Sequence, residues 1–189
     1  PPIKMGLIGY GPHGREIARN LAQLPSAPLV AVADHYGAMQ RRAKREYPKA
    51  ASYDNYQDLL KDKNVEGVVI ATAPHDHREI AIAALRSGKH VYCESPLGGT
   101  VEDAKAIAKA AAEHPQQNFQ AGLQFRSEPQ RHFMFPFMRA GAIGKAVHAR
   151  TQWHKKTSWR FVSPNTEREK LINWRLDPEL SPGLVGEIG

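Results

Sequence analysis

The chain has 189 residues, of which 41% are hydrophobic and 24% charged, close to the averages of globular proteins, so disordered and fibrous classes are excluded. A net charge of +7 at pH 7 suits nucleic acid, an anionic surface or an anionic cofactor, but identifies none of them. No segment approaches the roughly 18 consecutive apolar residues of a membrane-spanning helix. The single cysteine, Cys93, excludes an intrachain disulfide, and the cellular compartment stays open.

Short apolar runs and helical patterns alternate along the first two thirds of the chain. The runs predict buried strands over residues 3–9, 29–34, 65–73, 89–94 and 118–124. The patterns between them predict helices over residues 14–24, 36–47, 55–62, 76–88 and 100–114. Thr100 and Asp103 form an N-cap pair, and Gly88 is a C-cap candidate. Strict alternation of this kind favours an α/β fold with a doubly wound parallel sheet.

The rhythm changes after residue 124. A helix-like stretch over 128–144 is followed by a strand-like stretch over 145–154 and a proline- and charge-rich stretch over 155–182. We therefore expect one α/β domain over 1–124 and the beginning of an α+β domain over 125–189. About 65 residues do not easily complete a domain with its own core, so we expect the second domain to be incomplete.

A glycine fingerprint follows the first predicted strand. Gly9, Gly11 and Gly14 stand in the pattern G-x-G-x-x-G, between a strand and a helix, where this pattern binds the pyrophosphate of a dinucleotide. Gly9 permits a tight turn, Gly11 lets the pyrophosphate approach the backbone, and Gly14 lets the helix pack closely on the strand.

Asp34 ends the second predicted strand, twenty residues after Gly14. A carboxylate at this position accepts hydrogen bonds from both ribose hydroxyls of NAD and repels the additional phosphate of NADP. The alternative is that Asp34 is an ordinary turn residue at the end of a strand. Arg41 and Arg42 are cations that would attract a 2'-phosphate, so the sequence favours NAD without excluding NADP.

Two further segments, "IATAPHDHREIAI" and "GKHVYCESPLGGTVEDAKAI", complete a resemblance to the Gfo/Idh/MocA family of NAD(P)-dependent sugar oxidoreductases. The resemblance extends to "AGLQFRSEPQ" and "INWRLDPELSPGLVGEIG" and so covers essentially the whole chain. It implies a Rossmann fold followed by a substrate and oligomerisation domain. The cofactor-binding residues it implies are Gly9, Tyr10, Gly11, Pro12, His13, Gly14, Asp34, Ala71, Thr72, Ala73, Pro74, His77, Glu94, Ser95, Gln124, Trp174 and Arg175.

Glu94, Ser95 and Pro96 match the family's Glu-Lys-Pro motif, with a serine in place of the lysine. In the family that lysine contacts the substrate hydroxyl and assists proton transfer. A serine hydroxyl lacks the charge of an ammonium group. An inactive form, another base, a chemistry without the lysine and a structural turn are all open explanations. The catalytic candidates are Ser95, at the lysine position, and Arg175.

Other candidate residues have two interpretations each. Trp174 and Arg175 either line a sugar site or pack in a proline-rich segment. The cluster His154, Lys155, Lys156 and Trp159 suits an anionic sugar or an exposed strand end. His75 and His77 lie two residues apart, but no further ligand has metal-binding spacing, so no metal site is expected.

The resemblance also bears on activity and length. In the family the segment seen here as "GLVGEIG" continues into a substrate-facing histidine, and this chain stops at Gly189, so we expect a piece of a longer protein. The expected function is hydride transfer between NAD and a sugar or polyol, in a homo-oligomer without nucleic acid or membrane partners. The alternatives are a glycosidase that uses NAD for transient oxidation and a non-catalytic dinucleotide-binding module.

Overall fold

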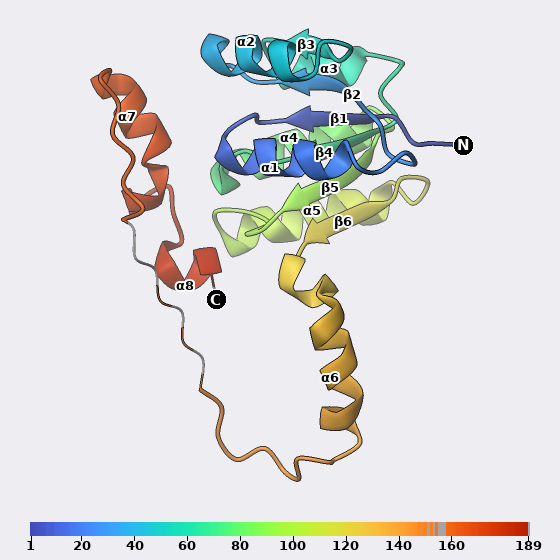
Figure 1. The fold of residues 1–189 in the computed structure, drawn as a ribbon, viewed down its shortest axis with the longest axis vertical. Helices are drawn as coiled ribbons and strands as arrows, with labels where there is room; N and C mark the ends of the chain where they lie inside the picture. The colour runs from blue at the N-terminus through green and yellow to red at the C-terminus, as the bar shows by residue number, and fades with distance from the viewer. Residues whose placement is uncertain (151, 153, 155–157, 189) are drawn as a thin grey trace. The chain divides into compact units, whose positions relative to one another are not determined.

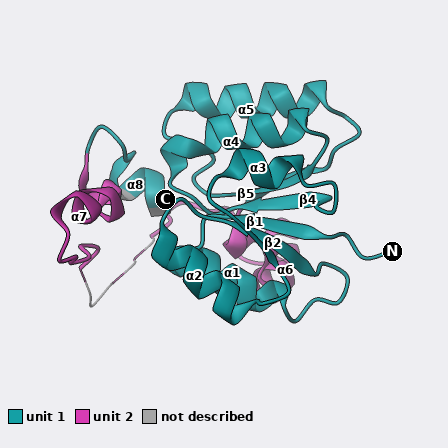
Figure 2. Cartoon of the chain, turned by 90° about the horizontal axis from the view of Figure 1, so that it is seen from above, with its two compact units in different colours: residues 1–122, 178–189 teal, residues 123–177 magenta. Residues whose placement is uncertain are grey.

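A computed structural model describes residues 1–150, 152, 154 and 158–188. It contains two compact units, residues 1–122 with 178–189 and residues 123–177 (Figure 2). Each unit is described by itself below. The division into functional domains at residue 124 stays a prediction.

A six-stranded parallel sheet forms the centre of the first unit (Figure 1). Its strands are β1 (Met5–Ile8), β2 (Leu29–Ala33), β3 (Ala51–Tyr53), β4 (Gly67–Ile70), β5 (His90–Glu94) and β6 (Phe119–Gly122). The strand order is β3-β2-β1-β4-β5-β6, so the chain winds outward from β1 to one edge and then from β4 to the other. The predicted doubly wound α/β architecture is confirmed.

Helices cover both faces of this sheet (Figure 2). On one face lie α1 (Pro12–Leu21) and α2 (Gly37–Glu46), and on the other α3 (Tyr56–Lys61), α4 (Pro74–Arg86) and α5 (Val101–Glu113). The predicted caps are present, since the Asp103 N–H donates to Thr100 Oγ1 at 3.1 Å and Gly88 has a φ of 78° after the end of α4. A positive φ of this size explains the glycine there.

Each face of the sheet has its own apolar core. Leu7, Val32 and Val69 pack against Ala18 of α1 and Ala43 of α2. The core on the opposite face contains the other buried side chains of the central strands and the apolar sides of α3, α4 and α5. All four residues of β4 are buried, which explains its unbroken apolar run.

Cys93 is fully buried in β5, where burial and then the Glu94 carboxylate raise the pKa of its thiol to about 12. Because the thiolate is the reactive form, we expect the folded protein to resist alkylation by iodoacetamide at neutral pH. The same protein in denaturant should incorporate one equivalent. Mass spectrometry measures both, and rapid stoichiometric labelling of the folded protein would contradict the buried position.

The sequence did not predict β3. This strand has three residues, and Ala51 and Ser52 are exposed at the edge of the sheet next to β2. Such a segment lacks the apolar run by which the other strands were predicted.

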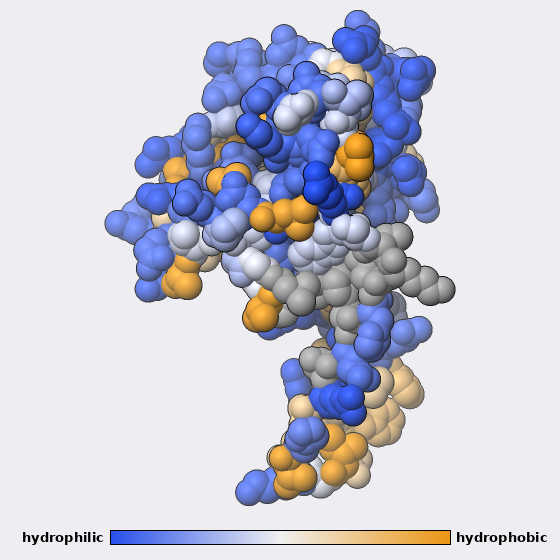
Figure 3. Space-filling model, turned by 90° about the vertical axis from the view of Figure 1, so that its left-hand side faces the viewer, coloured by the Kyte–Doolittle hydropathy of each residue, from blue (hydrophilic) through white to orange (hydrophobic). Residues whose placement is uncertain are grey.

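The second unit contains α6 (Pro129–Arg139), α7 (Thr166–Ile172) and short 3₁₀ turns at Gln124–Ser127 and Trp174–Leu176. No residue of α6 or α7 is buried, and Phe133 and Phe137 are 70% and 53% exposed. Apolar side chains gather accordingly on the part of Figure 3 that α6 and the segment after it occupy. The predicted helix over 128–144 is thus present in part, as α6.

The strand predicted over 145–154 is wrong for the described residues 145–150, which form no strand. A strand requires a hydrogen-bonded neighbour, and the described residues pair no segment with 145–150. In the stretch from 155 to 182, α7 was not predicted. The last helix, α8 (Gly183–Ile188), belongs to the first unit.

Candidate dinucleotide-binding site

The order of the strands reverses between β1 and β4. β1 and β4 are neighbours, but the chain leaves them in opposite directions, toward β3 and toward β6. In open parallel sheets, ligands bind beyond the carboxyl ends of the strands at this reversal. The loops that follow β1, β2, β4 and β5 therefore form the candidate site.

The turn after β1 is closely packed at two of its three glycines. Gly9 has a φ of 92°, and a Cβ there would lie 2.8 Å from the carbonyl oxygen of Ala71, in the loop after β4. A Cβ on Gly14 would lie 1.9 Å from the carbonyl oxygen of Gly9. Gly9 and Gly14 thus permit a left-handed turn and a close approach of α1 to that turn.

Gly11 differs from both, because a Cβ added there would meet no atom within 4 Å. Gly11 is the N-cap of α1 and has no side chain that could cap the helix. Pro12 follows it, and the first turn of α1 contains no acidic residue. At Gly11, free space therefore coincides with the partial positive charge of the N-terminus of α1. This arrangement fits the pyrophosphate of a dinucleotide.

Asp34 follows β2 and is linked to two loops. Its Oδ2 accepts the backbone N–H of Tyr10 at 2.7 Å, and its Oδ1 accepts that of Tyr36 at 2.8 Å. Each carboxylate oxygen retains a further lone pair, so both can also accept a ribose hydroxyl. The side chain of Gln40 donates to the Asp34 carbonyl at 2.6 Å, which fixes the start of α2 against this strand end.

The Tyr10 side chain lies away from the glycine-rich turn, in the core beneath α1 and α2. It is 0% exposed, and its hydroxyl donates to Glu46 Oε2 at 2.6 Å. Burial and then the Glu46 carboxylate raise the pKa of Tyr10 well above its ordinary value. Tyr10 therefore presents its backbone N–H to the site, and that group is bound to Asp34.

Arg42 is also bound to Glu46, with 2.6 Å between its Nε and Oε1. Hydrogen bonds from Tyr10 and then Arg42 lower the pKa of Glu46. Arg41 belongs to the first half of α2, and its guanidinium lies 3.4 Å from the position of a Cβ on Gly37. Arg41 and Arg42 are the two cations that would attract a 2'-phosphate. Of these, Arg41 lies over the start of α2, the helix that follows Asp34.

The loop after β4 contains Ala71, Thr72 and Ala73, which are half-buried, and leads into the buried Pro74. His77, one turn into α4, is 1% exposed. Its ring nitrogens lie within hydrogen-bond distance of two backbone carbonyls. The family resemblance implies a place for His77 in the segment beside the nicotinamide, and that place stays a prediction.

Glu94 at the end of β5 joins the two halves of the site, because its Oε2 lies 3.2 Å from Nε2 of His13 on α1. Burial pushes the pKa of Glu94 upward, but His13 and hydrogen bonds from Tyr92 and the Ser95 backbone outweigh burial, and the pKa is lowered. Tyr92 was not among the predicted residues. Its spacing from Glu94, two residues along one strand, places both side chains on the same face.

Ser95 is exposed directly after Glu94 and precedes Pro96. Its side chain therefore lies at the surface of the candidate site. The hydrogen bonds of the described residues include none between the Ser95 hydroxyl and a side chain that would activate it as a nucleophile.

Gln124, Trp174 and Arg175 belong to the second unit. Within that unit the Arg175 guanidinium lies 4.2 Å from the centroid of the Trp174 ring. Their predicted place beside the cofactor or substrate stays a prediction. Lys155 and Lys156 lie outside the described residues, as do 151, 153 and 157.

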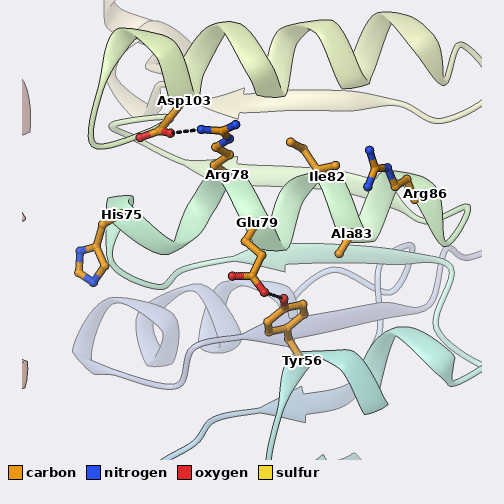
Figure 4. A pocket seen from close by; sticks show the side chains of 8 residues that line it. All are labelled: Tyr56, His75, Arg78, Glu79, Ile82, Ala83, Arg86 and Asp103. Atoms are coloured by element: carbon orange, nitrogen blue, oxygen red, sulfur yellow. Dashed lines mark hydrogen bonds and ion pairs between the residues drawn. The ribbon is translucent and has the colours of Figure 1, made fainter.

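A separate groove of about 500 Å³ lies on the helical face formed by α3, α4 and α5 (Figure 4). Arg78 pairs with Asp103 at 3.2 Å on one side, and Tyr56 donates to Glu79 on the other. Among the described residues no three His, Cys, Asp or Glu side chains are placed to hold a metal ion. No helix in the described ranges is long and apolar enough to cross a membrane.

Comparison with known proteins matches residues 3–122 to a family described as "Oxidoreductase family, NAD-binding Rossmann fold", the Gfo/Idh/MocA family. The chain belongs to this family. The first unit is therefore the NAD-binding Rossmann fold of a Gfo/Idh/MocA protein, as its strand order and its glycine-rich turn indicate.

Relatives of this Gfo/Idh/MocA chain include dehydrogenases and a glycosidase. It is 31% identical over 175 residues to inositol 2-dehydrogenase from Salmonella paratyphi B, covering 90% of this chain and 52% of the relative. It is 28% identical to an alpha-N-acetylgalactosaminidase from Shewanella oneidensis, covering 92% of this chain and 39% of that protein. The chain thus spans about half, or less, of the length of these curated relatives.

A solved structure of scyllo-inositol dehydrogenase from Lactobacillus casei, with bound NAD(H) and scyllo-inositol, is similar to this Gfo/Idh/MocA chain with a TM-score of 0.72. The two are 27% identical, and the match covers 76% of this chain and 43% of that one. Relatives that act on polyols with NAD therefore share the fold described above.

Proposed function

We propose that the protein of which this chain forms part is an NAD-dependent oxidoreductase acting on a sugar, polyol or related carbohydrate. The observation that carries the proposal is the pairing of an open glycine, Gly11, at the start of α1 with the carboxylate of Asp34 at the end of the next strand. The similarity to inositol dehydrogenases supports a polyol as the substrate class.

Each part of the site has a separate task in this proposal. The backbone around Gly11 binds the pyrophosphate, and Asp34 accepts the adenosine ribose hydroxyls. Residues 71–74 and Glu94 line the nicotinamide end of the site. NAD supplies the hydride acceptor when bound. For Arg175, which lies in the second unit, the binding of substrate hydroxyls stays a prediction from the sequence.

Calorimetric titration with NAD and NADP tests the binding step, and NADH absorbance with a panel of inositols and sugars tests oxidation in the whole protein. We expect NAD to bind more tightly than NADP and at least one polyol to be oxidised. Binding of NAD without oxidation of any polyol or sugar would favour the non-catalytic module.

A second candidate is a glycosidase that uses bound NAD for transient oxidation. Two observations favour it, the serine at position 95 and the similarity to an alpha-N-acetylgalactosaminidase. Such an enzyme would release an aglycone without net formation of NADH. Assays of nitrophenyl glycosides with and without added NAD separate this candidate from a dehydrogenase.

Ser95→Lys distinguishes the same two candidates. In a dehydrogenase we expect the new ammonium group to raise the rate of polyol oxidation about tenfold, because it stabilises charge that develops in the transition state. The NAD dissociation constant should stay within about threefold, since Ser95 follows β5, whereas Gly11 and Asp34 follow β1 and β2 on the other side of β4. Steady-state kinetics on one polyol and calorimetry measure the two effects.

Ser95→Met is the matched control, because methionine is close to lysine in length and carries no charge. A rise with Met equal to that with Lys would show that side-chain length, and not charge, changes the rate. A fall in aglycone release with Lys would instead support the glycosidase.

A further inference from the structure

His77 makes two contacts that the cofactor role predicted for it does not explain. Its Nδ1 lies 3.0 Å from the carbonyl oxygen of Pro96, and its Nε2 lies 3.2 Å from that of Thr72. With 1% of its surface exposed, the ring is enclosed by protein. Both polar atoms of the side chain thus face backbone and neither faces solvent.

The two carbonyl groups belong to different loops. Thr72 follows β4 and Pro96 follows β5, and these strands are neighbours in register, with Ile70 opposite Cys93. Both loops lie beyond the carboxyl ends of their strands, on the side of the sheet reversal where a dinucleotide would bind. Beyond the ends of β4 and β5 the ladder no longer fixes the distance between the two backbones.

We infer that His77 is a positioning residue whose imidazole ties the loop after β4 to the loop after β5 and so sets the width of the nicotinamide end of the site. The inference rests on the proposed NAD chemistry for its functional consequence. The structural tie itself depends on the hydrogen bond to the Pro96 carbonyl and on the position of His77 in α4, the helix that begins directly after the loop following β4.

The protonation of the ring decides which bond is made. Burial lowers the pKa of His77, against the hydrogen bonds to Thr72 and Pro96 and the charges of Asp76 and Glu94, which raise it. A neutral imidazole has one N–H donor, and both partners are acceptors. We take the tautomer with the proton on Nδ1, the nitrogen of the shorter contact, which donates to the Pro96 carbonyl.

Two substitutions separate this tie from simple filling of the core. His77→Phe keeps a ring of similar size and removes both nitrogens. His77→Asn places an amide N–H close to the position of Nδ1 and can still donate to Pro96. Hydrogen exchange of the protein without cofactor, followed by mass spectrometry on peptides covering 71–76 and 93–98, measures the loops directly.

We expect His77→Phe to raise exchange in both peptides about tenfold, with exchange in β1 and β2 unchanged, because local opening precedes global unfolding. His77→Asn should retain protection of 93–98. An equal increase in every peptide, or the same exchange in Phe and Asn variants, would overturn the inference. If His77→Phe does not fold, His77→Leu, which also has no side-chain donor, replaces it, and protection of 93–98 in that variant equal to wild type overturns the inference likewise.

In the whole protein, His77→Phe should lower kcat about tenfold or more while the NAD dissociation constant changes by less than about threefold, and Asn should restore part of kcat. A large loss of NAD affinity with kcat unchanged would instead make His77 a cofactor ligand. If the wild-type protein bound no NAD, the proposed function would fail, but the exchange result would still decide the structural tie.

Discussion

Gly14→Ala is expected to abolish measurable NAD binding and to lower the free energy of unfolding by about 2–3 kcal/mol. The new Cβ would lie 1.9 Å from the carbonyl oxygen of Gly9, a backbone atom that cannot rotate away. The start of α1 would have to move off the glycine-rich turn, which displaces Gly11 and the N–H groups of the first helical turn. Urea unfolding and calorimetric titration with NAD measure the two effects.

Gly11→Ala is the matched control for that substitution. A methyl group at Gly11 meets no atom within 4 Å, so the free energy of unfolding should change by less than about 1 kcal/mol, the range for an N-cap glycine. NAD affinity should nevertheless fall at least about tenfold, because the methyl group occupies the space of the pyrophosphate. Unchanged NAD affinity in both variants would refute the assignment of this turn to the pyrophosphate.

Asp34→Asn is expected to weaken NAD binding about tenfold and to strengthen NADP binding by a similar factor. The substitution keeps the shape of the side chain and one oxygen acceptor, but removes the charge that would repel a 2'-phosphate. That repulsion is on the order of 1–3 kcal/mol at partly screened distances. Calorimetric titration of both dinucleotides at low and high salt measures the change.

The control for net charge is Glu113→Gln, at the far end of α5, where the carboxylate lies 3.9 Å from Lys109. This variant should bind both dinucleotides as the wild type does. Arg41→Ala in the Asp34→Asn protein should remove part of the gain in NADP affinity, whereas Arg42→Ala should not, because Arg42 is bound to Glu46. NADP binding tighter than NAD in the unmodified protein would contradict the role of Asp34.

The elements around the site could be predicted because their patterns are local. The run over 65–73 marks β4, although the strand itself covers Gly67–Ile70 and its last three predicted residues form the loop. The strand-turn-helix context of Gly9, Gly11 and Gly14 likewise needs no information from distant residues. β3 was missed because a short, exposed edge strand carries little apolar signal.

The side-chain contacts of the site could not be predicted, because they join segments far apart in the chain. His77 was placed correctly near the start of α4, but its inward direction depends on the Pro96 carbonyl, nineteen residues later. The pairing of His13 with Glu94 and of Tyr10 with Glu46 has the same origin. Residue spacing along one element does not encode such partners.

The reversal of strand order between β1 and β4 also bears on how the protein folds. Met5 lies opposite Gly67, so this central pairing joins residues about sixty positions apart, whereas each half of the sheet is built from successive βα units. Contacts of long sequence separation form late, so the junction of the halves is expected to close after each half has collapsed. A dinucleotide that spans the junction binds the native state alone, and at a concentration of 100 times its dissociation constant it would add about 2.7 kcal/mol of stability. A supply of cofactor would then lower the fraction of folded protein that reopens at this junction and is exposed to proteases.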